Sequence, residues 1–96
     1  MADLNQYDLG DLIELSAIFK DRDLVLADPS TVTLKIKPPS GTVATFTGEV
    51  VNDAVGLYHM DYEPAEVGSY DYKFYGTGNV HAAEEGIFYV RAEKVV

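Results

Sequence analysis

The side chains that most often carry enzyme chemistry are scarce in this sequence of 96 residues, which has no cysteine and only two histidines, His59 and His81. The histidines fall on separate predicted strands, and His59 alternates with apolar residues, so its ring is expected to face solvent. A metal site shared by the two is the less favoured alternative. Catalysis needs a nucleophile or base held beside a partner, and no such constellation is visible. We therefore predict a non-enzymatic protein without a metal or other cofactor.

Carboxylates are plentiful, and two groups of them are candidates for a calcium site and for a catalytic pair. Asp21, Asp23 and Asp28 offer oxygen ligands that would suit Ca²⁺. The fuller pattern of spaced acids with a glutamate is missing, so a solvated turn is the favoured interpretation. Glu84 and Glu85 are adjacent on a predicted strand, where neighbouring side chains face opposite ways, so they do not form a catalytic pair. They are expected to discourage pairing at a sheet edge.

The overall charge limits the class of partner. Sixteen acidic residues against seven basic ones give a net charge of −9, which argues against binding to nucleic acid or to an anionic membrane. No apolar run approaches the roughly 20 residues needed to span a bilayer, and the N-terminal stretch has no secretory pattern. We expect a soluble protein that is made in a cytoplasm, with docking onto a basic protein surface as an alternative to plain solubility.

Apolar and polar residues alternate with period two along most of the chain, which is typical of strands with one buried face. The predicted strands cover 12–20, 31–37, 42–51, 57–62, 69–75 and part of 80–92, with a brief strand or extended link at 24–27. Turn signals recur about every ten residues, and no window shows a convincing helical stripe with caps. This pattern predicts an all-β fold: one immunoglobulin-like (Ig-like) β-sandwich over residues 1–96, with about seven antiparallel strands in a Greek-key arrangement.

Four aromatic rings crowd into the stretch 69–75 and raise the question of a binding patch. Tyr70, Tyr72 and Phe74 share one face of the predicted strand, which we assign to the core. Tyr70 follows Gly68 by two residues, just beyond a proline-containing corner. A tyrosine in this place can return its hydroxyl to an upstream backbone group, as in the tyrosine corner of Greek-key sandwiches. Gly68, Tyr70, Tyr72 and Phe74 are therefore predicted to be critical for the fold.

Tyr75 lies on the opposite face of the same strand, together with Asp71 and Lys73. We expect Tyr75 to be exposed and name these three residues as the candidate contact with a partner. Tyr62 and Tyr89 are the other aromatic residues that could add to an exposed platform.

Several motifs together resemble a family, the small Ig-like proteins encoded among the structural genes of tailed bacteriophages and prophages. The matching segments are a "YDLGD" opening (7–11), "DPSTVTL" (28–34), "GLY" (56–58), "GSYDY" (68–72) and an "AEEGIFYV" ending (83–90). The resemblance covers roughly residues 7 to 91. Members often carry tryptophan, which this chain lacks.

This resemblance implies a virion structural protein, and our first hypothesis is a capsid decoration or cement subunit that contacts the major capsid protein. A head–tail connector or tail protein is the alternative within the same class. A module that recognises a host glycan or protein is the alternative from another class. Homo-oligomers are compatible with each. Residues 1–9 and 93–96 are interpreted as an N-terminal arm and a C-terminal tail that could add short strands to neighbouring subunits.

Overall fold

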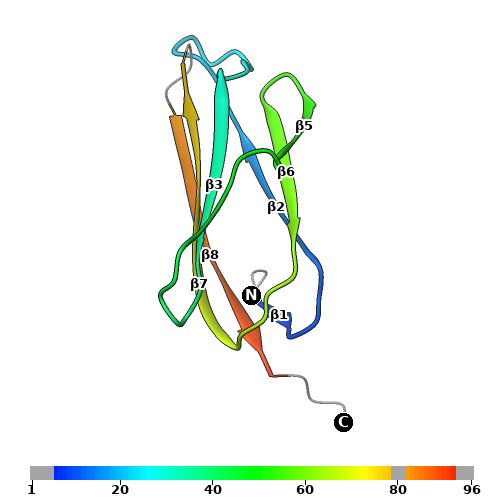
Figure 1. Cartoon of the computed structure of the whole chain (residues 1–96). Helices are drawn as coiled ribbons and strands as arrows, with labels where there is room; N and C mark the ends of the chain where they lie inside the picture. Colours follow the sequence, from blue (N-terminus) through cyan, green and yellow to red (C-terminus); the bar gives the residue numbers. More distant parts are fainter. Residues whose placement is uncertain (1–5, 79–81, 93–96) are drawn as a thin grey trace.

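A computed structural model describes residues 6–78 and 82–92 of the chain, with the backbone alone described at 82 and 83. It has eight strands in two layers (Figure 1). The strands are β1 (Gln6–Asp8), β2 (Ile13–Ile18), β3 (Thr31–Lys37), β4 (Ala44–Phe46), β5 (Val51–Ala54), β6 (Leu57–Tyr62), β7 (Gly68–Thr77) and β8 (Ala82–Arg91). The described residues include no helix that could cross a membrane.

The two sheets have the orders β1-β8-β7-β3-β4 and β2-β6-β5, which confirms the predicted Ig-like β-sandwich. The described residues form eight strands, in line with the predicted number of about seven. One detail of the prediction is wrong, because β1 pairs with β8 in parallel. A three-residue strand followed by a turn has no sequence signal of its own, and the alternation rule does not report strand direction.

The segment 42–51, predicted as one strand, divides into two that lie in different sheets. The chain leaves the larger sheet after β4, turns at Thr47–Val50, and joins the smaller sheet as β5. Figure 1 shows this green connection crossing from one layer to the other. Gly48 lies in this turn, with no atom of another residue close to the position that a Cβ would occupy. An irregularity in pairing falls between Asn52 and Ala54, in residues that lie between the predicted strands.

The inward-facing residues of both sheets form one apolar core, as the alternation predicted. Leu34, Ile36, Phe74 and Val90 are completely buried. From the smaller sheet, the core receives Ile13, Leu15, Ala17, Tyr58 and Met60, with Phe19 directly after β2. Sheet faces with alternating bulky apolar residues pack together because removing that surface from water is favourable.

Residues 6–8 of the predicted N-terminal arm belong to the sandwich, since they form β1 at the edge of the larger sheet. Asp8 forms a 2.8 Å ion pair with Arg91, and the ring of Tyr7 packs edge-on against Phe88 at 5.9 Å. Residues 1–5 and the predicted tail at 93–96 lie outside the described residues.

Candidate functional site

The central strand β7 is held in place by the tyrosine corner. The Tyr70 hydroxyl accepts a hydrogen bond from the Glu66 backbone N–H at 3.0 Å and donates one to the Glu66 carbonyl at 3.1 Å. The Tyr70 ring is buried and stacks on Phe88, with ring centroids 4.7 Å apart. The predicted tyrosine corner is confirmed. It ties the loop that precedes β7 to the core and so fixes where the outward side chains of this strand emerge.

Tyr72 and Phe74 also face inward, as predicted, but Tyr72 is only partly buried. Its ring covers Gly86 on β8, where a side chain of any size would collide with the Tyr72 phenol. Partial burial raises the pKa of the Tyr72 hydroxyl, and the nearby Glu84 carboxylate adds to the effect. An aromatic ring over a glycine on the neighbouring strand protects exposed backbone, so Tyr72 supports the sheet.

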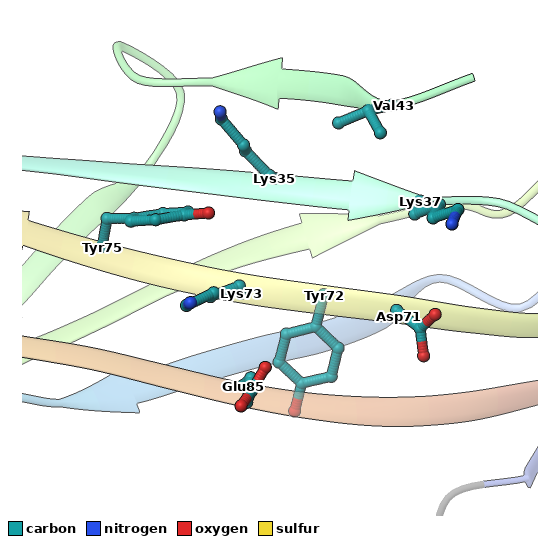
Figure 2. A pocket seen from close by; sticks show the side chains of 8 residues that line it. All are labelled: Lys35, Lys37, Val43, Asp71, Tyr72, Lys73, Tyr75 and Glu85. Atoms are coloured by element: carbon teal, nitrogen blue, oxygen red, sulfur yellow. The ribbon is translucent and has the colours of Figure 1, made fainter. Parts of the chain in front are cut away.

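The outward side chains of β7 join those of β3 to form a basic patch, which we call the lysine face: Lys35, Lys37, Lys73 and Tyr75 on the outer side of the larger sheet (Figure 2). Lys73 lies directly opposite Lys35 in the ladder, and Asp71 lies opposite Lys37. The structure therefore brings together the three predicted contact residues and adds two lysines. Sequence reasoning missed these because strand pairing is invisible in a local pattern.

Tyr75 is clamped by this patch. The Lys73 Nζ lies 5.0 Å from the ring centroid and the Lys35 Nζ lies 5.4 Å from it, both within the range of cation–π attraction. In Figure 2 the ring is seen edge-on with the two lysine side chains on opposite sides. The lysines also cover the ring, so Tyr75 is half-buried instead of exposed as predicted. Tyr89, on the outer side of β8, is the more exposed aromatic at 42%.

The lysine face lines a shallow hollow of about 240 Å³, whose other lining residues are Val43, Tyr72 and the acidic residues Asp71 and Glu85. Like charges placed directly opposite on neighbouring strands are destabilising. Among the described residues, no carboxylate lies within 4 Å of Lys35, Lys37 or Lys73. Three of the seven basic residues of an acidic chain thus share one open sheet face. The arrangement suits binding of an anionic group and contains no pair of residues arranged for nucleophilic or acid–base catalysis.

The opposite side of the molecule carries the reverse charge. On the outer side of the smaller sheet, Glu14 lies directly opposite Asp61, and the neighbouring row contains His59. The His59 Nδ1 lies 2.6 Å from a carboxylate oxygen of Asp53, and this interaction raises the pKa of the imidazole, with Glu14 and Asp61 adding to it. We call these four residues the acidic face. The prediction that His59 points outward is confirmed, whereas His81 lies outside the described residues.

The aspartates considered as calcium ligands lie in turns or connecting segments, which agrees with the favoured interpretation. The Asp21 carboxylate accepts hydrogen bonds from the backbone N–H groups of Asp23 and Val25, at 2.8 and 3.1 Å. Asp28 accepts from the Gly56 N–H at 2.7 Å and from the Tyr58 hydroxyl at 3.2 Å, tying two loops together. Across the described residues, no group of three or more acidic or histidine side chains is arranged to hold a metal ion.

Glu84 and Glu85 diverge as predicted. Glu85 lies opposite Lys73 on the outer face. The Glu84 carboxylate reaches the other sheet, where it accepts a hydrogen bond from the Ile18 N–H at 2.9 Å. It thus occupies a backbone donor at the edge of β2, as an inward-pointing charge on an edge strand can do.

A second hollow, of about 410 Å³, opens between the edges of the two sheets. Phe46 and Tyr62 line it with rings in an edge-to-face contact at 6.2 Å, and Glu49 and Asp61 stand among its other lining residues. Burial raises the pKa of the Tyr62 hydroxyl. Its lining combines apolar and acidic residues. Tyr62 is the one residue of this lining that the sequence analysis named as a candidate for an exposed aromatic platform.

Comparisons with known proteins agree on the fold. No family model matches the sequence, and no curated protein matches it significantly. The Lin-41 filamin domain superposes on the chain with a TM-score of 0.69 at 18% identity, covering 95% of this chain and 87% of the domain. A proposed glycoside hydrolase from Bacteroides vulgatus ATCC 8482 has a TM-score of 0.64 at 18% identity; the match covers 94% of this chain but only 17% of that one. At this identity the likeness shows the Ig-like fold alone.

Proposed function

We propose that this chain is a non-enzymatic structural protein of a tailed-bacteriophage particle, a capsid decoration or cement subunit that docks onto a neighbouring particle protein through the lysine face. The phage assignment is supported by the resemblance of the sequence motifs. The docking role is supported by one observation in particular. Lys35 and Lys73 are held directly opposite each other around Tyr75, on a sheet face that none of the described strands covers.

The lysine face should have less electrostatic repulsion in a complex with an anionic partner than in the isolated chain. A like-charged cross-strand pair weakens the isolated sheet, and an anionic group bound against the outer surface of the two lysines would lower the repulsion. The packed inner side of β7 holds the Tyr75 backbone, so the contact is pre-organised and little side-chain freedom is lost on binding. In a particle, repeated copies would make many weak contacts of this kind count together.

Particle composition tests the assignment directly. Quantitative mass spectrometry of purified particles would count this chain against the major capsid protein. For a decoration subunit, we expect a copy number that is a simple fraction of the number of major capsid proteins. A copy number small enough to form a single ring would favour the head–tail connector or tail alternative. Absence from the particle would overturn the virion assignment and leave a recognition module, which a glycan array with Tyr75→Ala as control would then probe.

Docking through the lysine face is tested with matched charge variants. The Lys35→Gln/Lys73→Gln variant should bind particles stripped of this protein at least about tenfold more weakly, the equivalent of roughly 1.4 kcal/mol. The control, Lys20→Gln/Arg22→Gln, removes the same charge from exposed residues elsewhere on the chain and should bind like the unaltered protein. Equal weakening by both pairs would mean that net charge matters and the lysine face does not.

A further inference from the structure

The lysine face and the acidic face have the same construction with opposite sign. Each has a like-charged pair directly opposite across its ladder, Lys35 with Lys73 in one sheet and Glu14 with Asp61 in the other. Both pairs lie on outer sheet faces, so they are separated by the full thickness of the sandwich. Each pair is unfavourable within one copy, and each would be relieved by the other pair on a second copy.

Exposed apolar residues accompany both pairs. Ile18 and Val51, 55% and 47% exposed, lie on the outer side of the smaller sheet. Ile87, 60% exposed, lies beside Asp71 on the outer side of the larger sheet, and Val43, 50% exposed, lines the hollow of the lysine face. Sheet faces pack on each other through side chains such as these. Each face therefore combines a charge that selects its partner with apolar surface that gains from burial.

We propose that the partner of the lysine face is the acidic face of a second copy, so that copies associate head-to-tail with Glu14 and Asp61 set against Lys35 and Lys73. This inference rests on the proposed function in one respect, since it takes the lysine face as the docking face. The contact is heterologous, with a different surface used on each side. Such contacts extend into rings or open chains according to the rotation between copies.

The net charge of −9 predicts how the association between copies depends on salt concentration. At about 0.01 M salt the screening length is about 30 Å, so whole copies repel each other. At about 0.1 M it is about 10 Å, which screens distant charges but leaves facing side chains attracted. At about 1 M it falls to about 3 Å and weakens the contact itself. Association should therefore be strongest at intermediate salt, whereas purely apolar association would persist or strengthen at high salt.

Sedimentation velocity of the purified full chain, up to about 1 mM, measures this association in the concentration range where weak interfaces are populated. We expect reversible oligomers at about 0.1 M salt that weaken at least about tenfold at 1 M. Lys35→Gln/Lys73→Gln and Glu14→Gln/Asp61→Asn should each be monomeric, because each lacks one face. Mixed in equal amounts, they should form one-to-one dimers that do not extend, because one intact face remains on each. Dimers in the mixture also require that both variants are folded.

Three results would overturn the inference: a wild-type chain that stays monomeric throughout, association that survives in either variant alone, or folded variants that fail to pair when mixed. Circular dichroism supplies the check on folding. A failure here is separable from a failure of the proposed function, which depends on particle counts and on particle binding. If the chain is monomeric but Lys35→Gln/Lys73→Gln still loses particle binding, docking stands and its partner is another particle protein.

Discussion

The two sides of β7 differ sharply in how deeply their side chains are buried. Its inward residues Tyr70 and Phe74 are almost completely buried and join the sheets. The outward residues, Lys73 and Tyr75, contact other outward side chains and contribute no buried apolar surface to the core. Because successive side chains alternate, the packed side determines where the open side points without taking part in it. Stability and the proposed docking should therefore be separable on this strand by substitution on one side or the other.

The largest effect should come from the inward side. Phe74→Ala removes a fully buried ring and leaves a cavity between the sheets, so we expect a loss of about 3–5 kcal/mol in the free energy of unfolding. Lys73→Ala, one position away and facing outward, should change it by less than about 0.5 kcal/mol. Urea unfolding followed by far-UV circular dichroism measures both. Comparable losses in the two variants would break the separation between the sides.

The tyrosine corner should come next. Tyr70→Phe keeps the ring but leaves the Glu66 N–H and carbonyl without their partner, with an expected cost of about 1–3 kcal/mol. The matched control is Tyr75→Phe, because the Tyr75 hydroxyl has no hydrogen-bond partner among the described side chains. Equilibrium unfolding in urea should show an unchanged slope and a lower midpoint for Tyr70→Phe only. An effect of similar size at Tyr75 would contradict the assigned roles.

A smaller effect is expected from the clamp on the outward side. Tyr75→Leu keeps an apolar strand residue but removes the ring between Lys35 and Lys73, with an expected cost of about 1 kcal/mol from two exposed cation–π contacts. Because the lysines then repel without a ring between them, the loss should shrink as salt is raised. Thermal unfolding at about 0.05 M and about 1 M salt measures the difference, because the screening length is more than about 10 Å at the lower concentration and about 3 Å at the higher. A salt-independent loss would mean that Tyr75 acts through packing alone.

The smallest effect should come from the other outer face, where Asp53 raises the pKa of His59 above its ordinary value near 6.5. A raised pKa in the folded state means that protonated His59 stabilises the fold. This contribution is fully present below the unfolded-state pKa and is lost as pH rises through the folded-state value. The melting temperature of wild type relative to His59→Gln should therefore be higher at pH 5.5 than at pH 8.5, on the scale of roughly 1 °C or less for a surface pair. The same difference at both pH values would rule out the ion pair as its cause.

Much of the fold was predictable because it depends on local alternation. Five of the predicted strands coincide with β2, β3, β6, β7 and β8, and the tyrosine corner followed from the spacing of Gly68 and Tyr70. Those signals are carried by consecutive residues with one buried face. The failures occurred where the local signal was weak. Residues 42–51 alternate acceptably throughout, so nothing local required the chain to change sheets after Phe46.

The candidate site was predictable only in part. Asp71, Lys73 and Tyr75 were placed on one face by counting residues along a strand. Lys35 and Lys37 were not, because their position beside β7 depends on strand pairing and register. Asp53 was missed as the partner of His59 because it lies between the predicted strands 42–51 and 57–62, although residues that flank a short hairpin are neighbours across it.

The sequence by itself determined five of the strands, β2, β3, β6, β7 and β8, and the side of each that faces the core. The tertiary structure alone decided which strands lie next to each other, and with that the pairing of Lys35 with Lys73 and of Glu14 with Asp61. The physical reason is that a period of two is satisfied by any partner strand. The choice among partners depends on how the two buried faces fit together, which is a property of the whole sandwich.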